Sequence, residues 1–448
     1  MHWKSFVALT TLAAAVQAAE KKAVSASAKS STTAAPKSTA AAPAASSSAA
    51  AAPASPLSGG TNPLAITIPS IPQTTSYDVN TECQAYSVPG LTIDPKQWPT
   101  IWDTATSNGM NTSAEFTSLY NSIDWTKKPS AAVRKATAAG GLDFTGYNAQ
   151  TDPDCWWSSS LCTIPKGAGI NADIYRCEEP ETWGLTYDDG PNCSHNAFYD
   201  FLQAQNLKAS MFYIGSNVLD WPYGAMRGLK DGHHIADHTW SHQLMTTLND
   251  QEVLAELYYT QKAIKFVTGV TPKYWRPAFG DVDDRVRWIA TQLNLTAVIW
   301  DLDTDDWAAG SSVPQATVEQ TYLDFIAMGT NGTYATKGNI VLTHEIDNTT
   351  MALAVKYLPQ IKAAYKNVLD VATCNNITNP YMEDSVTMTP FGNATTTNTT
   401  TSAGASGSGV APAASGSAAP ATSAKSGASA LTAPASLLAL VALAVFAQ

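Results

Sequence analysis

The sequence predicts an α/β fold in which parallel strands curl into a barrel. Two observations carry this prediction: short apolar runs alternate with helical patterns from residue 182 onward, and about seven such units follow one another. Strands that alternate with helices are typical of right-handed βαβ units, which build parallel sheets. A run of about seven units favours a barrel of about seven parallel strands over an open sheet.

Each element follows from its local pattern. The expected strands are short apolar runs, at 183–187, 209–214, 233–238, 274–277, 297–302, 339–343 and 368–371. The expected helices lie at 194–207, 221–230, 250–268, 283–293, 313–328 and 350–367. Helical spacing places Phe198, Phe201 and Leu202 on one face of the first helix, and Leu254 and Leu257 on the buried face of the third.

The domain organisation follows from where core-forming residues occur. Residues 19–75 and 381–426 are rich in Ser, Thr, Ala or Pro, and we expect these tails to be disordered. The barrel is expected at 172–380, behind an irregular extension at 76–171 that packs on it and contains a helix at 113–123. Five tryptophans of the extension could stack on sugar rings, although we favour burial against the barrel: Trp98, Trp102, Trp125, Trp156 and Trp157.

Both ends of the chain carry processing signals. Residues 1–18 combine a weakly basic start, an apolar run and small residues, which is typical of a signal peptide. Residues 427–448 end in an apolar tail, and the small residues and polar spacer before it indicate a glycosylphosphatidylinositol (GPI) anchor, with Ser426 as the candidate attachment site. A single-pass tail anchor is the alternative. We expect a secreted protein at the plasma membrane and cell wall, in contact with the membrane through the lipid anchor only.

Glycosylation sequons and cysteines agree with a secretory route. Eight N-x-Ser/Thr sequons begin at Asn111, Asn192, Asn294, Asn331, Asn348, Asn376, Asn393 and Asn398. The six cysteines predict three disulfides. Cys177 precedes the first polar motif and Cys374 follows the last strand-like run, so a bridge between them would close the domain.

The charge pattern limits the class of partner. The chain has 26 Lys and Arg against 37 Asp and Glu, a net charge of −11, and no cluster of basic residues. Nucleic acid and anionic lipid are therefore excluded as the expected ligands, and a neutral or cationic polymer is favoured. We expect a monomer.

Polar residues occur directly after the strand-like runs, where parallel α/β folds build their sites. These clusters are Asp188 and Asp189, His238 and His242, Arg276, Asp303 and Asp306, and His344. If the barrel forms, they become neighbours at one face.

The histidine pair suggests a metal site. His238 and His242 are four residues apart and can point the same way on a helical turn, although such a pair alone is more often structural. Asp188 or Asp189 can add a carboxylate, which leaves an open position for water, as in catalytic zinc sites. Zinc is the favoured ion and cobalt an alternative. Both aspartates cannot point the same way along a strand, so we expect a turn to begin there, at Gly190.

The remaining polar residues suggest acid–base chemistry. The aspartate that does not bind metal can take a proton from water, and Arg276 can hold it through a bidentate pair. His344 is a candidate general acid, which a carboxylate of Asp303 or Asp306 would orient. Three further histidines are not expected to take part: His233 and His234 in packing or hydrogen bonding, and His195 at the surface.

Five ordered motifs resemble those of carbohydrate esterase family four, the polysaccharide deacetylases. The motifs are Thr186-Tyr187-Asp188-Asp189-Gly190-Pro191, His238-x-x-x-His242, Arg276-Pro277-Ala278-Phe279-Gly280, Asp303-x-x-Asp306-Trp307 and Leu342-Thr343-His344. Three positions depart mildly from the family pattern: Tyr187 stands where Phe is usual, Ala278 where Pro is common, and Glu345 where Asp is common.

The resemblance implies a distorted (β/α) barrel and a role for each motif. Asp188 would be the base, held by Arg276, and His344 the acid, tuned by Asp306. The ligands of one divalent metal ion would be Asp189, His238 and His242. The backbone N–H of Phe279 would bind the oxyanion, and Trp307 and Leu342 would line the acetyl pocket.

The expected activity is removal of N-acetyl groups from chitin, an N-acetylglucosamine polymer, to give chitosan and acetate during cell-wall remodelling. The secretion, sequon and anchor features are similar to those of fungal chitin deacetylases of the mannoprotein kind. Two alternatives stay open: another acetylated polysaccharide such as acetylxylan or peptidoglycan as substrate, and a sugar-binding wall mannoprotein without catalysis.

Overall fold

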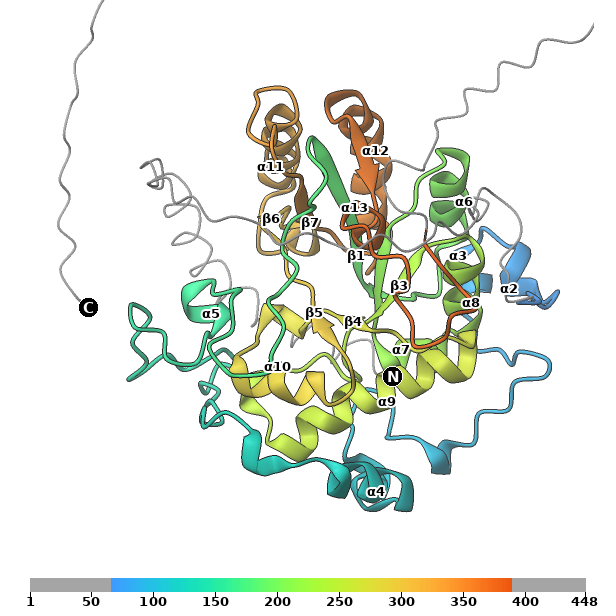
Figure 1. Cartoon of the computed structure of the whole chain (residues 1–448). Coiled ribbons are helices and arrows are strands. Elements are labelled where there is room, and N and C mark those ends of the chain that lie inside the picture. The colour runs from blue at the N-terminus through green and yellow to red at the C-terminus, as the bar shows by residue number, and fades with distance from the viewer. Residues whose placement is uncertain (1–65, 389–448) are drawn as a thin grey trace, which may run out of the picture. The chain divides into compact units, whose positions relative to one another are not determined.

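A parallel sheet lies at the centre of the computed structural model, which describes residues 66–388, and helices pack around it (Figure 1). The strands are β1 (Thr182–Gly190), β2 (Ser210–Tyr213), β3 (His234–Asp237), β4 (Tyr274–Trp275), β5 (Thr296–Ala297), β6 (Leu302–Asp303), β7 (Asn339–Leu342) and β8 (Asn367–Leu369). Their order is β5-β4-β3-β2-β1-β7-β6, and β8 also pairs with β1. All the pairs are parallel, which confirms the α/β prediction.

The segment 296–303 joins the two ends of this order. It was expected as one strand at 297–302, but it forms two short strands with different partners: β5 pairs with β4, and β6 pairs with β7. Between them, Val298 N–H donates to Trp275 O at 2.8 Å and Asp301 N–H to Ile340 O at 3.1 Å. One extended stretch therefore contacts both ends of the sheet, and the sheet is curled.

The helices that follow the strands are α6 (Asn196–Ala204), α7 (Gly215–Asp220), α8 (Pro222–Lys230), α9 (Asp250–Thr268), α10 (Asp284–Thr291), α11 (Gln315–Met328), α12 (Asn348–Ala364) and α13 (Val371–Cys374). Helix α9 has the predicted bounds because Asn249 and Glu252 form a capping box at its start and Gly269, at φ +85°, ends it. Helix α7 was not predicted. It has six residues, and all but the last are buried, so it lacks an amphipathic pattern.

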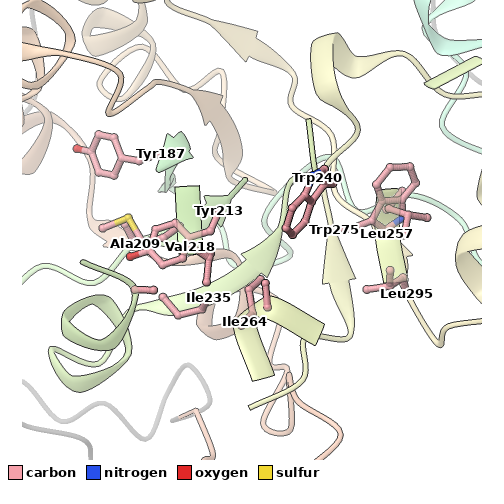
Figure 2. Packing of buried hydrophobic residues seen from close by; sticks show 14 of the residues in the cluster. Tyr187, Ala209, Tyr213, Val218, Ile235, Trp240, Leu257, Ile264, Trp275 and Leu295 are labelled. Atoms are coloured by element: carbon pink, nitrogen blue, oxygen red, sulfur yellow. The ribbon is translucent and has the colours of Figure 1, made fainter. Parts of the chain in front are cut away.

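The sheet has one core on each face, because side chains alternate along a strand. Tyr213 of β2, Ile235 of β3 and Ile264 of α9 belong to the larger core, between sheet and helices (Figure 2). Phe212 and Ala236, their neighbours on β2 and β3, belong to the smaller core. This smaller core also contains Val298, Ile340 and the disulfide Cys177–Cys374.

The N-terminal extension contains α2 (Pro72–Thr75), α3 (Val79–Glu82), α4 (Ala114–Ser122), α5 (Trp157–Ser160) and the 3-10 helices η1 (Pro95–Gln97), η2 (Ser107–Thr112) and η3 (Trp125–Lys127). Trp98 and Trp156 are buried, as favoured, and Trp98 stacks on Trp240 with ring centroids 6.4 Å apart. The disulfide Cys83–Cys193 ties the extension to the barrel. With Cys155–Cys162 and Cys177–Cys374 it completes the three expected bridges.

The ordered part is longer at both ends than the sequence suggested. Helix α2 lies before the expected boundary at residue 75, and Gln73 in it is buried. Tyr381, placed at the start of the C-terminal tail, is buried and bridges Pro272. No helix within residues 66–388 is long and apolar enough to cross a membrane. The expected signal peptide at 1–18, the anchor signal at 427–448, Ser426, Asn393 and Asn398 lie outside the described residues.

Candidate active site

Asp188 and Asp189 lie at the end of β1, in a distorted part of the strand. The expected turn is absent, since β1 continues to Gly190. Its register against β2 shifts between Asp188 and Gly190, and Asp189 has a left-handed φ of +70°. The irregularity changes the direction of Asp189, so both carboxylates reach the imidazole of His238.

Asp189, His238 and His242 form a group that could hold a metal ion. Asp189 Oδ1 lies 3.3 Å from His238 Nε2 and 3.2 Å from His242 Nε2. The two histidines were expected to share a helical turn, but they do not. They lie in the loop after β3, in which Thr239 and His242 have φ values of +66° and +54°.

The protonation of this group suits a divalent cation. Burial alone would raise the pKa of Asp189, but His242, His238 and His344 together lower that pKa below its usual value. Burial lowers the pKa of His242 to about 4, against the opposing charge of Asp189. His238 Nδ1 lies 2.8 Å from Arg276 O, which assigns its proton to Nδ1 and leaves the Nε2 lone pair facing Asp189. Asp189 Oδ1 is buried and accepts no hydrogen bond, so this oxygen is available as a metal ligand.

Asp188 forms a buried ion pair with Arg276. The Arg276 guanidinium is fully buried, and its Nη1 donates to Asp188 Oδ1 at 2.6 Å and to Thr186 Oγ1 at 2.9 Å. The expected bidentate pair is therefore a single contact shared with a threonine. The other carboxylate oxygen, Oδ2, lies 3.6 Å from His238 Nε2, beside the group that could hold a metal ion.

His344 is paired with Asp306, which decides between the two aspartates considered. Asp306 Oδ1 lies 2.6 Å from His344 Nδ1, and Asp306 Oδ2 accepts the His344 backbone N–H at 2.9 Å. Burial alone would lower the pKa of His344, but Asp306, with smaller effects of Asp189 and Asp188, raises the pKa to about 9. Asp303 instead accepts the backbone N–H of Asp305 at 2.9 Å.

The other residues expected at the site flank this centre. Phe279, in the 3-10 helix η5 (Ala278–Gly280), has a φ of +58°, and its ring lies 4.4 Å from that of His242. Trp307 is half-buried in η6 (Asp306–Ala308), next to Asp306. Leu342 is buried at the end of β7, two residues before His344.

Glu345 and His195 were misjudged or missed from the sequence. Glu345 is fully buried, its backbone N–H donates to Asp188 O at 3.0 Å, and Tyr199 Oη lies 3.3 Å from its Oε1. A Cβ at Gly190 would lie 1.8 Å from Glu345 Oε1, so this carboxyl group packs directly beneath the β1 end. His195 is buried rather than exposed, with its ring edge-on to Tyr199 at 4.5 Å.

The remaining histidines and the sequons are placed as follows. His233 Nδ1 accepts the Ala209 N–H at 3.1 Å and His234 Nδ1 lies 2.8 Å from Ser210 Oγ, which confirms their hydrogen-bonding role. Four sequon asparagines are exposed: Asn294, Asn331, Asn348 and Asn376. The other two described ones are half-buried, and their side-chain amides donate within the protein: Asn111 to Gln251, and Asn192 to Ile346 O.

The structure combines a parallel α/β fold with a buried carboxylate–arginine pair and a carboxylate–histidine pair beside three residues that could hold a metal ion, a combination typical of metal-dependent hydrolases. Residues 175–298 match the model of the polysaccharide deacetylase family. The chain is 68% identical over 325 residues to a chitin deacetylase of Amylomyces rouxii, with 72% of this chain and 77% of that protein covered. It is 51% identical over 321 residues to chitin deacetylase 2 of Cryptococcus neoformans var. grubii, with 70% of each chain covered.

The solved structure of a chitin deacetylase from Colletotrichum lindemuthianum covers 48% of this chain and 96% of its own, at 23% identity and a TM-score of 0.44. The chain belongs to the polysaccharide deacetylase family, on the strength of its sequence relatives, and is an enzyme.

Proposed function

We propose that this enzyme removes N-acetyl groups from chitin and releases acetate. The observation that carries the proposal is the placing of Asp188 and His344, which are bridge partners at the ends of neighbouring strands, beside one group that could hold a metal ion, each with its own buried partner. The names of the relatives at 68% and 51% identity support chitin as the polymer.

The ligand set proposed for one divalent ion is Asp189, His238 and His242. Three donors of this kind, with an open position, are typical of catalytic zinc, and cobalt is also compatible with them. A bound ion would lower the pKa of water from 15.7 to about 7 and polarise a carbonyl oxygen. Asp189 Oδ1, which is buried and accepts no hydrogen bond, supports the assignment.

The protein groups supply the proton transfers. Asp188 accepts a proton from water at Oδ2, the oxygen that Arg276 does not contact, and hydroxide attacks the acetyl carbon. The Phe279 backbone N–H would donate to the developing oxyanion. His344 keeps Nδ1 on Asp306, so its Nε2 proton goes to the leaving nitrogen as the C–N bond breaks. Trp307 and Leu342 would line the acetyl pocket.

The proposal extends to the place where the enzyme acts. The two processing signals and the sequons support secretion, glycosylation and a lipid anchor at the cell wall, and the three disulfides suit an oxidising compartment. An enzyme held there would act on chitin of its own wall, as a monomer.

The test is acetate release by the purified protein from chitin oligomers and, separately, from acetylxylan, for wild type and Asp188→Asn. We expect release from chitin oligomers that the substitution reduces at least about 100-fold, since general-base groups contribute about 10²–10⁴-fold. Faster release from acetylxylan would change the substrate. Near wild-type activity of the variant would remove Asp188 from the mechanism, and binding of chitin without any release would indicate a sugar-binding protein.

A further inference from the structure

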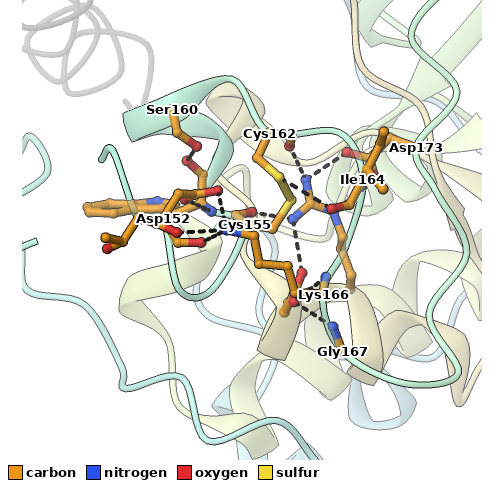
Figure 3. The surroundings of a disulfide bond; sticks show 12 residues. Asp152, Cys155, Ser160, Cys162, Ile164, Lys166, Gly167 and Asp173 are labelled. Carbon is orange, nitrogen blue, oxygen red and sulfur yellow. Dashed lines mark hydrogen bonds and ion pairs between the residues drawn. A yellow bond between two sulfur atoms is a disulfide. The ribbon is translucent and has the colours of Figure 1, made fainter. Parts of the chain in front are cut away.

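The loop at residues 155–162 of the N-terminal extension is closed by the disulfide Cys155–Cys162 and contains helix α5 (Figure 3). The Arg287 guanidinium, from α10, donates to Cys155 O at 2.6 Å and to Cys162 O at 2.9 Å. The same guanidinium pairs with buried Asp173 at 2.6 Å. The loop is therefore attached to the barrel by a buried cation at both ends of its disulfide.

A second attachment is the carboxylate of Asp281, which is fully buried and accepts four hydrogen bonds. Its Oδ1 accepts the Trp156 indole N–H and the Ser158 hydroxyl, both at 2.9 Å. Its Oδ2 accepts the Thr246 N–H at 2.9 Å and the Thr246 hydroxyl at 2.7 Å. Asp281 follows the Phe279 loop and Thr246 follows the His242 loop. One carboxylate thus links the extension to two loops of the candidate active site.

These attachments place the Trp157 indole against Gly280. A Cβ at Gly280 would lie 2.3 Å from Trp157 Cζ3 and 2.9 Å from Trp300, so the two indoles fill the space of a side chain. Their ring centroids are 4.8 Å apart, at an interplanar angle of 64°. Gly280 follows Phe279, whose ring contacts His242, and Trp300 lies 5.5 Å from the Arg276 guanidinium. The indole pair is therefore next to the catalytic centre.

The neighbouring tryptophans Trp156 and Trp157 have different surroundings. Trp156 is fully buried, and Asp281 accepts its N–H. Trp157 and Trp300 are only half-buried, and Leu161, at the end of the same loop, is 38% exposed. A partly exposed indole has an electron-rich face on which the C–H groups of a pyranose can stack. A ring that is already held in place loses little conformational freedom when a sugar binds.

We propose that Trp157, supported by Trp300, forms a sugar-binding subsite for a second unit of the polysaccharide chain whose acetylated unit lies at the catalytic centre. The proposal rests on the proposed function. It gives the disulfide-closed loop a role, which is to hold an aromatic surface at a fixed place beside Phe279. It also predicts that longer oligomers are preferred, through a residue of the extension that lies outside the five motifs.

The test compares kcat/KM for fully acetylated chitin oligomers of two and five units, in wild type, Trp157→Ala, Trp157→Phe and Trp125→Ala. Trp125 is the matched control: it is a half-buried tryptophan of the same extension, but it packs on Tyr120 and Trp288. We expect the five-unit to two-unit ratio of kcat/KM to fall about tenfold in Trp157→Ala, by less in Trp157→Phe and not in Trp125→Ala.

An equal loss on both oligomers in Trp157→Ala leaves the ratio unchanged; it would show a purely structural role and overturn the proposal, and so would unchanged kcat/KM values on both oligomers. Binding is measured separately, by calorimetric titration of the five-unit oligomer into Asp188→Asn and into Asp188→Asn combined with Trp157→Ala. We expect the Kd to rise about tenfold with the second substitution. If wild type releases no acetate from either oligomer, the proposed function fails, and this titration still decides: an unchanged Kd overturns the subsite.

Discussion

Asp306 holds His344 through both of its carboxylate oxygens: Oδ1 lies 2.6 Å from the ring Nδ1, and Oδ2 accepts the backbone N–H of the same residue at 2.9 Å. The contact fixes the position of the ring and its protonation together. The Nδ1 proton stays on the Asp306 side, and Nε2 remains free to deliver a proton. The order of the strands explains this contact, because β6, which precedes Asp306, pairs with β7, which precedes His344.

The first prediction concerns the alkaline limit of activity. The pKa of His344 is raised from 6.5 to about 9, so the proton-donating form prevails below that pH. Replacing Asp306 by Asn removes the main cause of the shift, and we expect the alkaline limb of the kcat/KM profile to move down by about 1–3 pH units. An ion beside Asp189 would cancel part of the attraction, so the wild-type limb should lie below pH 9 in the metal-loaded enzyme.

The same pair has a stability signature with a defined sign. A histidine with a raised pKa contributes stability that is complete below its unfolded pKa and is lost as the pH rises through the folded one. The excess stability of wild type over Asp306→Asn should therefore be largest near pH 6 and shrink toward pH 9. Melting temperatures across this range measure it, and a constant difference would contradict the pairing.

The second prediction concerns the buried ion pair of Arg276 and Asp188. Arg276→Met leaves Asp188 buried without its cation, which should cost about 3–5 kcal/mol of unfolding free energy. Adding Asp188→Asn removes the uncompensated charge, so the double variant should recover much of that stability but no activity. Urea unfolding of wild type, the two single variants and the double variant gives the four free energies of a double-mutant cycle. Additive losses would mean that the 2.6 Å contact does not couple the two residues.

The third prediction concerns the metal. Chelation should abolish activity and lower the melting temperature, because an ion that binds only the folded state adds about 2.7 kcal/mol at 100 times its Kd. His242→Ala should also lose the bound metal. His233→Gln is the control, because it changes a buried histidine whose partner is Ala209 N–H. The control should keep about one metal per chain even if it melts earlier. Full activity after exhaustive chelation would contradict the metal assignment.

The parts of the fold that were predictable are those with local causes. Helix α9 begins at a capping box and ends at a glycine, and all three residues lie within or beside it in the sequence. The segment 296–303 was mispredicted because its two halves bond to residues near 275 and 340, and no local pattern records a change of partner. The direction of the Asp189 side chain depends likewise on a shift in the register of β1 against β2, which no local pattern records.

The candidate site divides in the same way. The spacing of polar residues after strands indicated Asp188, His238, Arg276 and His344, because parallel strands bring their ends together. Spacing alone left Asp303 and Asp306 open as partners of His344; the resemblance implied Asp306, and the pairing of β6 with β7 brings it to His344. Asp281 gave no signal, since its donor Trp156 lies 125 positions away in the extension.

The last prediction concerns Glu345, which stands where this family commonly has Asp. Burial, with smaller effects of Asp189 and Asp188, raises the pKa of Glu345 well above 4.5 against the hydrogen bond from Tyr199, which favours the protonated form in the folded protein. A glutamine has the same shape and no charge, and Glu345→Gln should change stability by less than about 1 kcal/mol near pH 5, whereas Glu345→Ala should cost about 2–5 kcal/mol through the cavity under Gly190.

The pH dependence provides the control for this prediction. A carboxyl group with a raised pKa loses its contribution to stability as the pH rises above its unfolded pKa of about 4.5, because the unfolded chain ionises freely and the buried group cannot. Glu345→Gln lacks this loss, so its melting temperature should gain on wild type between pH 5 and pH 8. If the melting temperature of the variant instead drops relative to wild type as the pH rises, Glu345 is ionised in the folded enzyme. That result would contradict the prediction, because the buried Oε2 has no hydrogen-bond partner in the structure to stabilise a charge.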